Sequence, residues 1–139
     1  MIALPPRILV SFDIDGTLEM GDPPGPLTAA FVRHAKAQGC VIGSASDRTL
    51  REQSAMWQGA GIEVDFISAK QNLGRVRDTF ACRRFVHFGD TLIDAHFAEL
   101  AGFEFLSVLS LPARAAHEIG SPDGISEQFA RYLGALVLP

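Results

Sequence analysis

Short apolar runs alternate with amphipathic stretches along most of the chain. Four of these runs are bounded by polar residues or glycine and are too short for helices, so each predicts a buried β-strand. They are Ile8–Phe12, Cys40–Gly43, Val64–Ser68 and Arg84–Phe88. A fifth run, Phe103–Leu109, predicts one more strand.

The stretches between and after these runs predict helices over about 26–38, 46–59, 70–82 and 91–101, with a last helix after the turn GSPDG. Pro26 suits a first helical position, and Ser46 or Asp47 suits the N-cap of the second helix. In the fourth helix, the apolar residues are predicted to face mostly inward, namely Leu92, Ala95, Phe97 and Leu100.

The alternation of strands and helices predicts the fold class. Right-handed crossovers between successive strands give a doubly wound parallel sheet of about five strands, Rossmann-like, with helices on both faces. The length of 139 residues suits one domain, 1–139, and an apolar fraction of 47% with 20% charged residues is typical of a globular protein. In such sheets ligands bind beyond the carboxyl ends of the strands.

Polar side chains gather at that edge of the predicted sheet. In chain order the strands deliver Asp13 and Asp15, then Ser44 and Ser46, then Ser68 and Lys70, and finally Asp90 with Asp94 one helical turn further on. Crowded carboxylates repel one another, and a hard cation that prefers oxygen ligands relieves the repulsion. We therefore expect Mg²⁺ there, bound by Asp13, Asp90 and a backbone carbonyl near Asp15.

A phosphate group is expected to bind beside this metal. Asp94 would orient metal-bound water or hold Lys70. The Ser44 hydroxyl, the Lys70 ammonium and backbone N–H groups after Asp13 would hold the phosphate oxygens. Ser44 is taken as the ligand and Ser46 as a helix cap, although a register two residues later stays open.

The pair Asp13 and Asp15 suits phosphoryl transfer. A carboxylate at Asp13 can attack phosphorus and form an aspartyl-phosphate. Asp15 can protonate the departing alkoxide and then take a proton from the attacking water. Gly16 permits a tight turn, and Thr17 can hydrogen-bond back to Asp15 and is counted among the phosphate-binding residues.

These residues resemble the haloacid dehalogenase superfamily of phosphohydrolases. "FDIDGTL" matches its first motif, "VIGSAS" looks like the second, Lys70 fits the third, and "HFGDTLID" resembles the fourth. The resemblance covers residues 8 to 101. It implies Asp13 as nucleophile and Asp15 as general acid/base. It also implies Mg²⁺ on Asp13, Asp90 and the Asp15 carbonyl, and a phosphoryl group on Ser44 and Lys70.

The chain departs from many members of that superfamily because it has no room for a cap domain. Only about two dozen residues separate Thr17 from Ser44, and about as many separate Ser44 from Lys70. The stretch "EMGDPPGP", 19–26, is expected to form a short flap. The resemblance then implies an open site, which serves either a large substrate or an oligomer whose second subunit covers the site.

The composition argues against two classes of binding partner, nucleic acids and membranes. The net charge of −4 gives no basic surface for a nucleic-acid backbone, and no apolar run approaches the roughly 18 residues of a membrane span. Cys40 and Cys82 lack metal-ligand spacing, which together with the absence of a signal peptide predicts a cytoplasmic protein. Only Lys36 and Lys70 are lysines, and Lys36 lies in the first helix, so a site lysine must be Lys70.

Other interpretations of the same residues lead to different functions. Arg48 is predicted to begin a helix rather than bind substrate, and His87 to be a packed or hydrogen-bonded core residue. A receiver domain would carry its phosphorylated aspartate on a middle strand, and a phosphomutase would need a cap to exclude water. A non-catalytic phosphate- or metal-binding module stays open, with a phosphomonoesterase acting on a small molecule or on a macromolecular phosphate as the first hypothesis.

Overall fold

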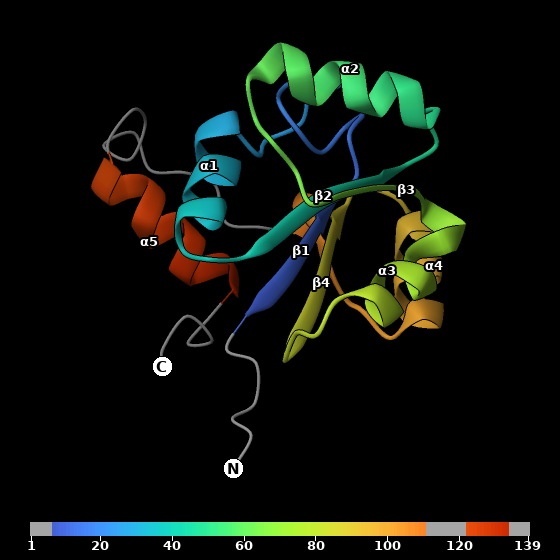
Figure 1. Ribbon diagram of the computed structural model, residues 1–139. Coiled ribbons are helices and arrows are strands. Elements are labelled where there is room, and N and C mark those ends of the chain that lie inside the picture. Colours follow the sequence, from blue (N-terminus) through green and yellow to red (C-terminus); the bar gives the residue numbers. More distant parts are fainter. Residues whose placement is uncertain (1–6, 111–121, 134–139) are drawn as a thin grey trace.

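The computed structural model describes residues 7–110 and 122–133 and contains one parallel sheet (Figure 1). Its strands are β1 (Ile8–Phe12), β2 (Val41–Ser46), β3 (Phe66–Ala69), β4 (Arg84–Gly89) and β5 (Glu104–Ser107). The five strands lie in the order β3-β2-β1-β4-β5. The prediction of a doubly wound α/β fold is confirmed, and no cap is evident in the described ranges.

Helices cover both faces of the sheet (Figure 1). One face packs against α1 (Ala29–Ala37), α2 (Leu50–Ala60) and α5 (Pro122–Leu133), and the other against α3 (Leu73–Thr79) and α4 (Leu92–Ala101). Short 3₁₀ turns follow β3 and β5, over Lys70–Asn72 (η1) and Val108–Ser110 (η2). No helix in the described part of the chain is both long and apolar enough to cross a membrane.

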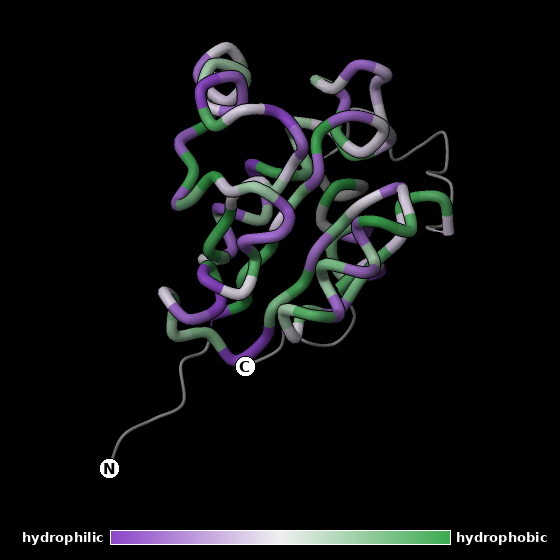
Figure 2. Tube along the Cα trace, turned by 90° about the vertical axis from the view of Figure 1, so that its right-hand side faces the viewer, coloured by the Kyte–Doolittle hydropathy of each residue, from purple (hydrophilic) through white to green (hydrophobic). Residues whose placement is uncertain are grey.

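The two-residue period of the strands divides the core. Val10 and Phe12 of β1 face the α1, α2 and α5 layer, whereas Leu9 faces α3 and α4. Phe12 and Phe88 stack with ring centroids 5.5 Å apart, and Phe31 of α1 meets both rings edge-on. Figure 2 shows the hydrophobic segments through the middle of the molecule and hydrophilic ones at many outer turns.

The second strand and helix differ from the prediction in their bounds. β2 runs on to Ser46, and α2 begins only at Leu50, so neither Ser46 nor Asp47 caps it. The cap is Thr49, whose hydroxyl accepts a hydrogen bond from the Glu52 N–H while the Glu52 carboxylate accepts one from the Thr49 N–H, both at 3.1 Å. This reciprocal capping box fixes the start of the helix.

The first helix begins later than predicted, and the end of the last helix is not tested. α1 begins at Ala29 behind the N-cap Thr28, so Pro26 is not its first residue. The helix predicted after the turn GSPDG is present as α5, and any continuation beyond residue 133 lies outside the described residues.

The inward face predicted for α4 is wrong for Leu92 and Leu100, whereas Ala95 and Phe97 are half-buried. Leu92 is 88% exposed and Leu100 is 71% exposed, whereas Asp94 and Ala98 are buried. The reason is a second capping box, in which Thr91 and Asp94 exchange hydrogen bonds and hold the Asp94 carboxylate against the sheet. A buried carboxylate with enough hydrogen bonds can decide which side of a short helix faces inward.

Candidate functional site

A pocket of about 190 Å³ lies at the carboxyl ends of β1, β2, β3 and β4. Four aspartates, one lysine and three other residues line it: Asp13, Asp15, Asp47, Asp90, Lys70, Pro23, Ser46 and Thr91. The site therefore forms where a doubly wound sheet places its ligands. Of the predicted site residues, the structure brings together Asp13, Asp15, Lys70 and Asp90, with Asp94 directly behind them.

Asp13 is held firmly at the end of β1. Its N–H donates to the Phe88 carbonyl of β4 at 2.8 Å, and its carboxylate Oδ1 accepts the Ile14 N–H at 2.8 Å. Only 4% of the residue is exposed. Its other oxygen, Oδ2, lies 3.5 Å from the Lys70 ammonium.

Lys70 is a buried cation surrounded by carboxylates. Its Nζ lies 3.3 Å from Asp94, 3.4 Å from Asp47 and 3.5 Å from Asp13. Burial acts to lower the pKa of this ammonium, but the three carboxylates outweigh it and raise the pKa above its ordinary value. Lys70 therefore stays charged, and a positive charge is fixed beside Asp13.

A raised pKa favours the charged form of Lys70, but for the Asp13 carboxyl a raised pKa favours the neutral form. Burial and the nearby Asp94 carboxylate raise its pKa to about 8, despite the opposing effect of Lys70. A divalent cation would favour the ionised form again, because a bound ion is the largest local charge in such a site. Without a bound cation, the positive charge of Lys70 is therefore too small to offset the effects of burial and Asp94 on the Asp13 carboxylate.

Asp94 is a buried anion held by a buried histidine. His87 lies between Ser11 and Asp94, with its Nδ1 2.9 Å from the Ser11 hydroxyl and its Nε2 2.9 Å from Asp94 Oδ1. Burial lowers the pKa of His87, so the ring is neutral, donates from Nε2 to Asp94 and accepts the Ser11 hydroxyl at Nδ1. His87 is therefore the hydrogen-bonded core residue that the sequence predicts.

Asp94 has both oxygens engaged within the protein. Oδ1 meets His87 and Lys70, and Oδ2 accepts from the Thr91 hydroxyl at 2.8 Å. Despite its burial, hydrogen bonds from His87 and the charge of Lys70 lower the pKa of Asp94. Of the two roles predicted for Asp94, the structure shows that it contacts Lys70.

Asp15 turns away from Asp13 toward Arg48. The Arg48 guanidinium donates to both Asp15 oxygens, Nη2 to Oδ1 at 2.6 Å and Nε to Oδ2 at 3.2 Å. The Asp22 N–H donates to Oδ1 as well, at 2.8 Å. Hydrogen bonding by Arg48 is the main cause that lowers the pKa of Asp15.

The predicted flap, 19–26, reaches this site. The Gly16 N–H donates to the Pro23 carbonyl at 2.7 Å, and Pro23 lines the pocket beside Asp15. An isolated bridge between Leu18 and Leu27 closes the base of the flap. The flap thus brings Pro23 to the pocket and the Asp22 N–H to the Asp15 carboxylate.

Asp90 contributes a buried carboxylate oxygen at this pocket. Its Oδ1 is buried and has no hydrogen bond among the described residues. Gly16 makes room for this carboxylate, because a Cβ at this position would overlap Asp90 Oδ2. The backbone φ of Gly16 is +75°, which residues other than glycine rarely adopt. Oxygens of Asp13, Asp90 and Asp94 lie within 4.8 Å of one another.

These observations fit a hard divalent cation. Buried polar atoms normally have partners, and the unpartnered Asp90 oxygen lies in a group of carboxylates that Lys70 neutralises only in part. Asp94 already has its oxygens engaged, so Asp13 and Asp90 remain the side chains best placed to hold the ion. A role for the Asp15 carbonyl stays a prediction.

Ser44, the predicted phosphate ligand, does not line the pocket. Ser44 is fully buried under α2, where its hydroxyl donates to Gln53 Oε1 at 2.6 Å and accepts the Trp57 Nε1–H at 2.9 Å. Ser46 lines the pocket instead. Because side chains alternate along β2, Ser44 and Ser46 share one face, and only Ser46 reaches the end of the strand.

Thr17 does not line the pocket either. Its side chain is completely buried, and its hydroxyl makes no hydrogen bond among the described residues, so it does not hold Asp15 as predicted. The turn through Gly16 directs Thr17 into the interior. The Thr17 N–H instead donates to the Ile14 carbonyl at 3.1 Å.

Two residues of the site were missed by sequence reasoning. Arg48 does not begin α2 but pairs with Asp15, 33 positions away in sequence. Asp47 lies at the rim with its side chain 80% exposed. The capping box of Thr49 and Glu52 is the local signal that would have left both residues in the loop between β2 and α2.

The fold and site together define an α/β protein with a parallel sheet and an acidic, lysine-containing pocket at its carboxyl edge. No protein-family model matches the chain, and no curated protein matches it.

Proposed function

We propose that this protein is a Mg²⁺-dependent phosphomonoesterase that works through an aspartyl-phosphate on Asp13. The observation that carries the proposal is the buried contact between Asp13 and Lys70, beside the unpartnered oxygen of Asp90. A carboxylate nucleophile, a fixed ammonium and a cation site are the parts that phosphoryl transfer from an oxygen ester needs.

Asp13 and Asp90 would hold the Mg²⁺ ion. When bound, the ion neutralises charge on the phosphoryl oxygens and on the site carboxylates. The Lys70 ammonium would bind a phosphoryl oxygen, and the Ser46 hydroxyl, which lines the same pocket, would donate to another. With the phosphorus held in line, a carboxylate oxygen of Asp13 attacks it and the ester oxygen departs.

Asp15 serves as the acid and then as the base. To act as the acid, Asp15 must leave its contact with Arg48 and take up a proton from solvent, which it then donates to the departing ester oxygen of the substrate. Once the alcohol leaves, the Asp15 carboxylate accepts a proton from the water that hydrolyses the aspartyl-phosphate. Arg48 supports the return of Asp15 to its ionised form between these steps.

The open pocket supports a substrate whose phosphate projects from the rest of the molecule, whether a small molecule or a macromolecule. Free Cys40 and Cys82 support a reducing compartment, so we place the activity in the cytoplasm. A second candidate function is a non-catalytic phosphate- or metal-binding module. It is favoured by one observation, that the Asp15 carboxylate is already fully engaged with Arg48 and Asp22.

Hydrolysis of a generic aryl phosphate tests the proposal. We expect turnover with Mg²⁺, loss of turnover with EDTA, and a fall of at least about a thousandfold in Asp13→Asn. Asp78→Asn, an exposed aspartate on α3, is the matched control and should be unaffected. Turnover that survives Asp13→Asn would rule out the nucleophile. A folded, Mg²⁺-binding protein that hydrolyses no phosphoester in a broad screen would favour the binding module.

A further inference from the structure

The Lys70 ammonium has as many carboxylate neighbours as it has N–H donors. A lysine ammonium carries three such donors. Asp94, Asp47 and Asp13 place carboxylate oxygens 3.3 Å, 3.4 Å and 3.5 Å from the Lys70 Nζ. A phosphoryl oxygen can therefore accept a hydrogen bond from this ammonium only after one of the three carboxylates has moved away.

Two of the three carboxylates are fixed in the core. Asp13 is buried and accepts the Ile14 N–H at 2.8 Å. Asp94 is also buried, and its two oxygens are engaged by His87 and Thr91. Moving either carboxylate would leave buried groups without their partners, which costs free energy. Asp13 and Asp94 therefore stay in place when an anion enters.

Asp47 differs from both in burial and in bonding. Its side chain is 80% exposed, and its carboxylate forms no hydrogen bond or ion pair with a described residue other than Lys70. It lies in the loop between β2 and α2, next to Ser46, and lines the same pocket. Rotation of this side chain into solvent would break one ion pair, which solvent screens on the Asp47 side, and would disturb no core packing.

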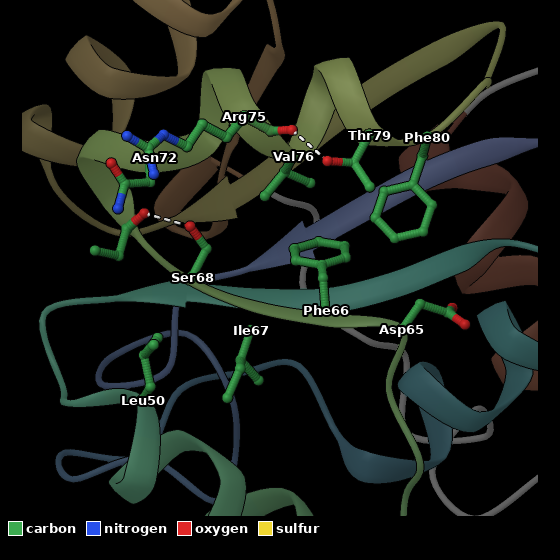
Figure 3. A pocket seen from close by; sticks show the side chains of 11 residues that line it. Leu50, Asp65, Phe66, Ile67, Ser68, Asn72, Arg75, Val76, Thr79 and Phe80 are labelled. Carbon is green, nitrogen blue, oxygen red and sulfur yellow. Dashed lines mark hydrogen bonds between the residues drawn. The ribbon is translucent and has the colours of Figure 1, made fainter.

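The ammonium faces the pocket that Asp47 borders. Lys70 lines this pocket, although only 4% of the residue is exposed. Figure 3 shows a neighbouring hollow of about 370 Å³ along β3, which is lined by Phe66, Val76 and Phe80 among others but not by Lys70. An anion that enters the acidic pocket therefore meets Lys70 beside Asp47.

We propose that Asp47 is a displaceable partner of Lys70, which leaves the ammonium when a phosphoryl group enters and displaces the phosphate product when it returns. This role of Asp47 rests on the proposed function, because it requires a phosphoryl group at Lys70. Asp47 lowers the affinity for substrate and for product by the same factor, since it competes with both for one ammonium. Its contribution to turnover is the release of the phosphate ion.

Titration of inorganic phosphate into the Mg²⁺-saturated full chain tests this role. Asp47→Ala should bind phosphate at least about threefold more tightly than wild type, because the anion no longer has to displace a carboxylate. Asp47→Glu, which keeps the charge, should stay close to wild type. With an aryl phosphate, Asp47→Ala should lower KM and the inhibition constant of phosphate by a similar factor and leave kcat no higher, as expected when substrate and transition state gain equally.

A matched control separates the contact with Lys70 from a general effect of charge. Asp22→Asn removes an exposed negative charge that acts on nearby Arg48, and Asp22 is not among the carboxylates around Lys70. This variant should change the phosphate affinity by less than about 1.5-fold. The melting temperature of Asp47→Ala should match that of wild type, because the side chain is largely exposed. Equal phosphate affinity in wild type and Asp47→Ala, or an equal gain in Asp22→Asn, would overturn the role of Asp47.

The results for binding and for turnover distinguish this role from the proposed function. Tighter phosphate binding by Asp47→Ala, without turnover by any variant, would support the competition for Lys70 and contradict the phosphatase. Turnover by wild type with the same KM in Asp47→Ala would contradict the competition alone. If neither wild type nor Asp47→Ala binds phosphate, Lys70 is not part of a phosphate site, and both proposals fail.

Discussion

Two buried polar networks lie on opposite faces of this sheet and differ in how well they are balanced. Under α2, Ser44, Gln53 and Trp57 form a neutral network in which the hydroxyl, amide and indole groups all have partners. Toward α4, Lys70 and the carboxylates of Asp13, Asp90 and Asp94 form a charged cluster in which carboxylates outnumber the cation. All polar groups of the neutral network have partners, whereas Asp90 Oδ1 in the charged cluster has no hydrogen-bond partner within residues 7–110 and 122–133.

This difference in hydrogen bonding and charge balance distinguishes a network that stabilises the fold from one that forms a binding site. Satisfied hydrogen bonds in a low-dielectric interior fix the position of α2 against β2 and β3. Uncompensated carboxylates cost stability in the absence of a ligand, and proteins retain such groups where they bind or react.

Loss of the buried cation should have the largest effect on stability. Lys70→Met leaves Asp13 and Asp94 without their ammonium partner, so the free energy of unfolding should fall by about 3 kcal/mol. Urea denaturation in EDTA measures this change. The only other lysine, Lys36, is exposed and gives the matched control Lys36→Met, which should change stability by no more than about 0.5 kcal/mol. Equal losses in the two variants would contradict the buried ion cluster.

Breaking the neutral network should cost somewhat less. Gln53→Leu keeps the approximate shape of the side chain but leaves the Ser44 hydroxyl and the Arg48 and Ser68 carbonyls without their partner. The expected loss is about 2 kcal/mol. Gln58→Leu on the exposed side of α2 is the control. A loss no larger than that of the control would show that the network is dispensable.

Removing one excess carboxylate should act in the opposite direction. Asp90→Asn reduces repulsion in the charged cluster, so the metal-free protein should become more stable by about 1 kcal/mol. Thermal unfolding in EDTA measures the change. If Asp90→Asn instead destabilises the metal-free protein, Asp90 serves the fold and the contrast between the two networks fails.

The smallest change concerns the pKa of Asp15. Arg48 lowers this pKa mainly by hydrogen bonding, so Arg48→Gln should raise it toward its ordinary value. A depressed folded pKa adds stability above the unfolded pKa and loses it as pH falls, so the variant should lose less stability on acidification. Carbon-13 NMR titration of the Asp15 carboxyl measures the pKa directly, and an unchanged value would contradict the ion pair.

The fold and much of the site were readable from the sequence. Alternating apolar runs predict the parallel sheet, and the bounds Ile8–Phe12 agree with β1. Asp13, Asp15, Lys70 and Asp90 follow strand ends, and a parallel sheet brings such residues together regardless of helix details. Lys70 was identifiable because the chain has a single alternative lysine.

The errors arose where long-range partners decide the outcome. Ser44 and Ser46 look alike in sequence, and only Gln53 and Trp57 on α2 show that Ser44 is part of the core. The Arg48 contact with Asp15 and the burial of Asp94 in place of Leu92 likewise depend on contacts across the fold. Local hydrophobic periodicity indicates whether a segment prefers helix or strand, but it contains no information about contacts with distant residues.

Isothermal titration of Mg²⁺ into the metal-free protein tests the central claim most directly, namely that the charged cluster is a divalent cation site. Wild type should bind one ion per chain, Asp90→Asn should bind it at least about tenfold more weakly, and Asp78→Asn should match wild type. Failure of the wild type to bind, or equal binding by wild type and Asp90→Asn, would contradict the account.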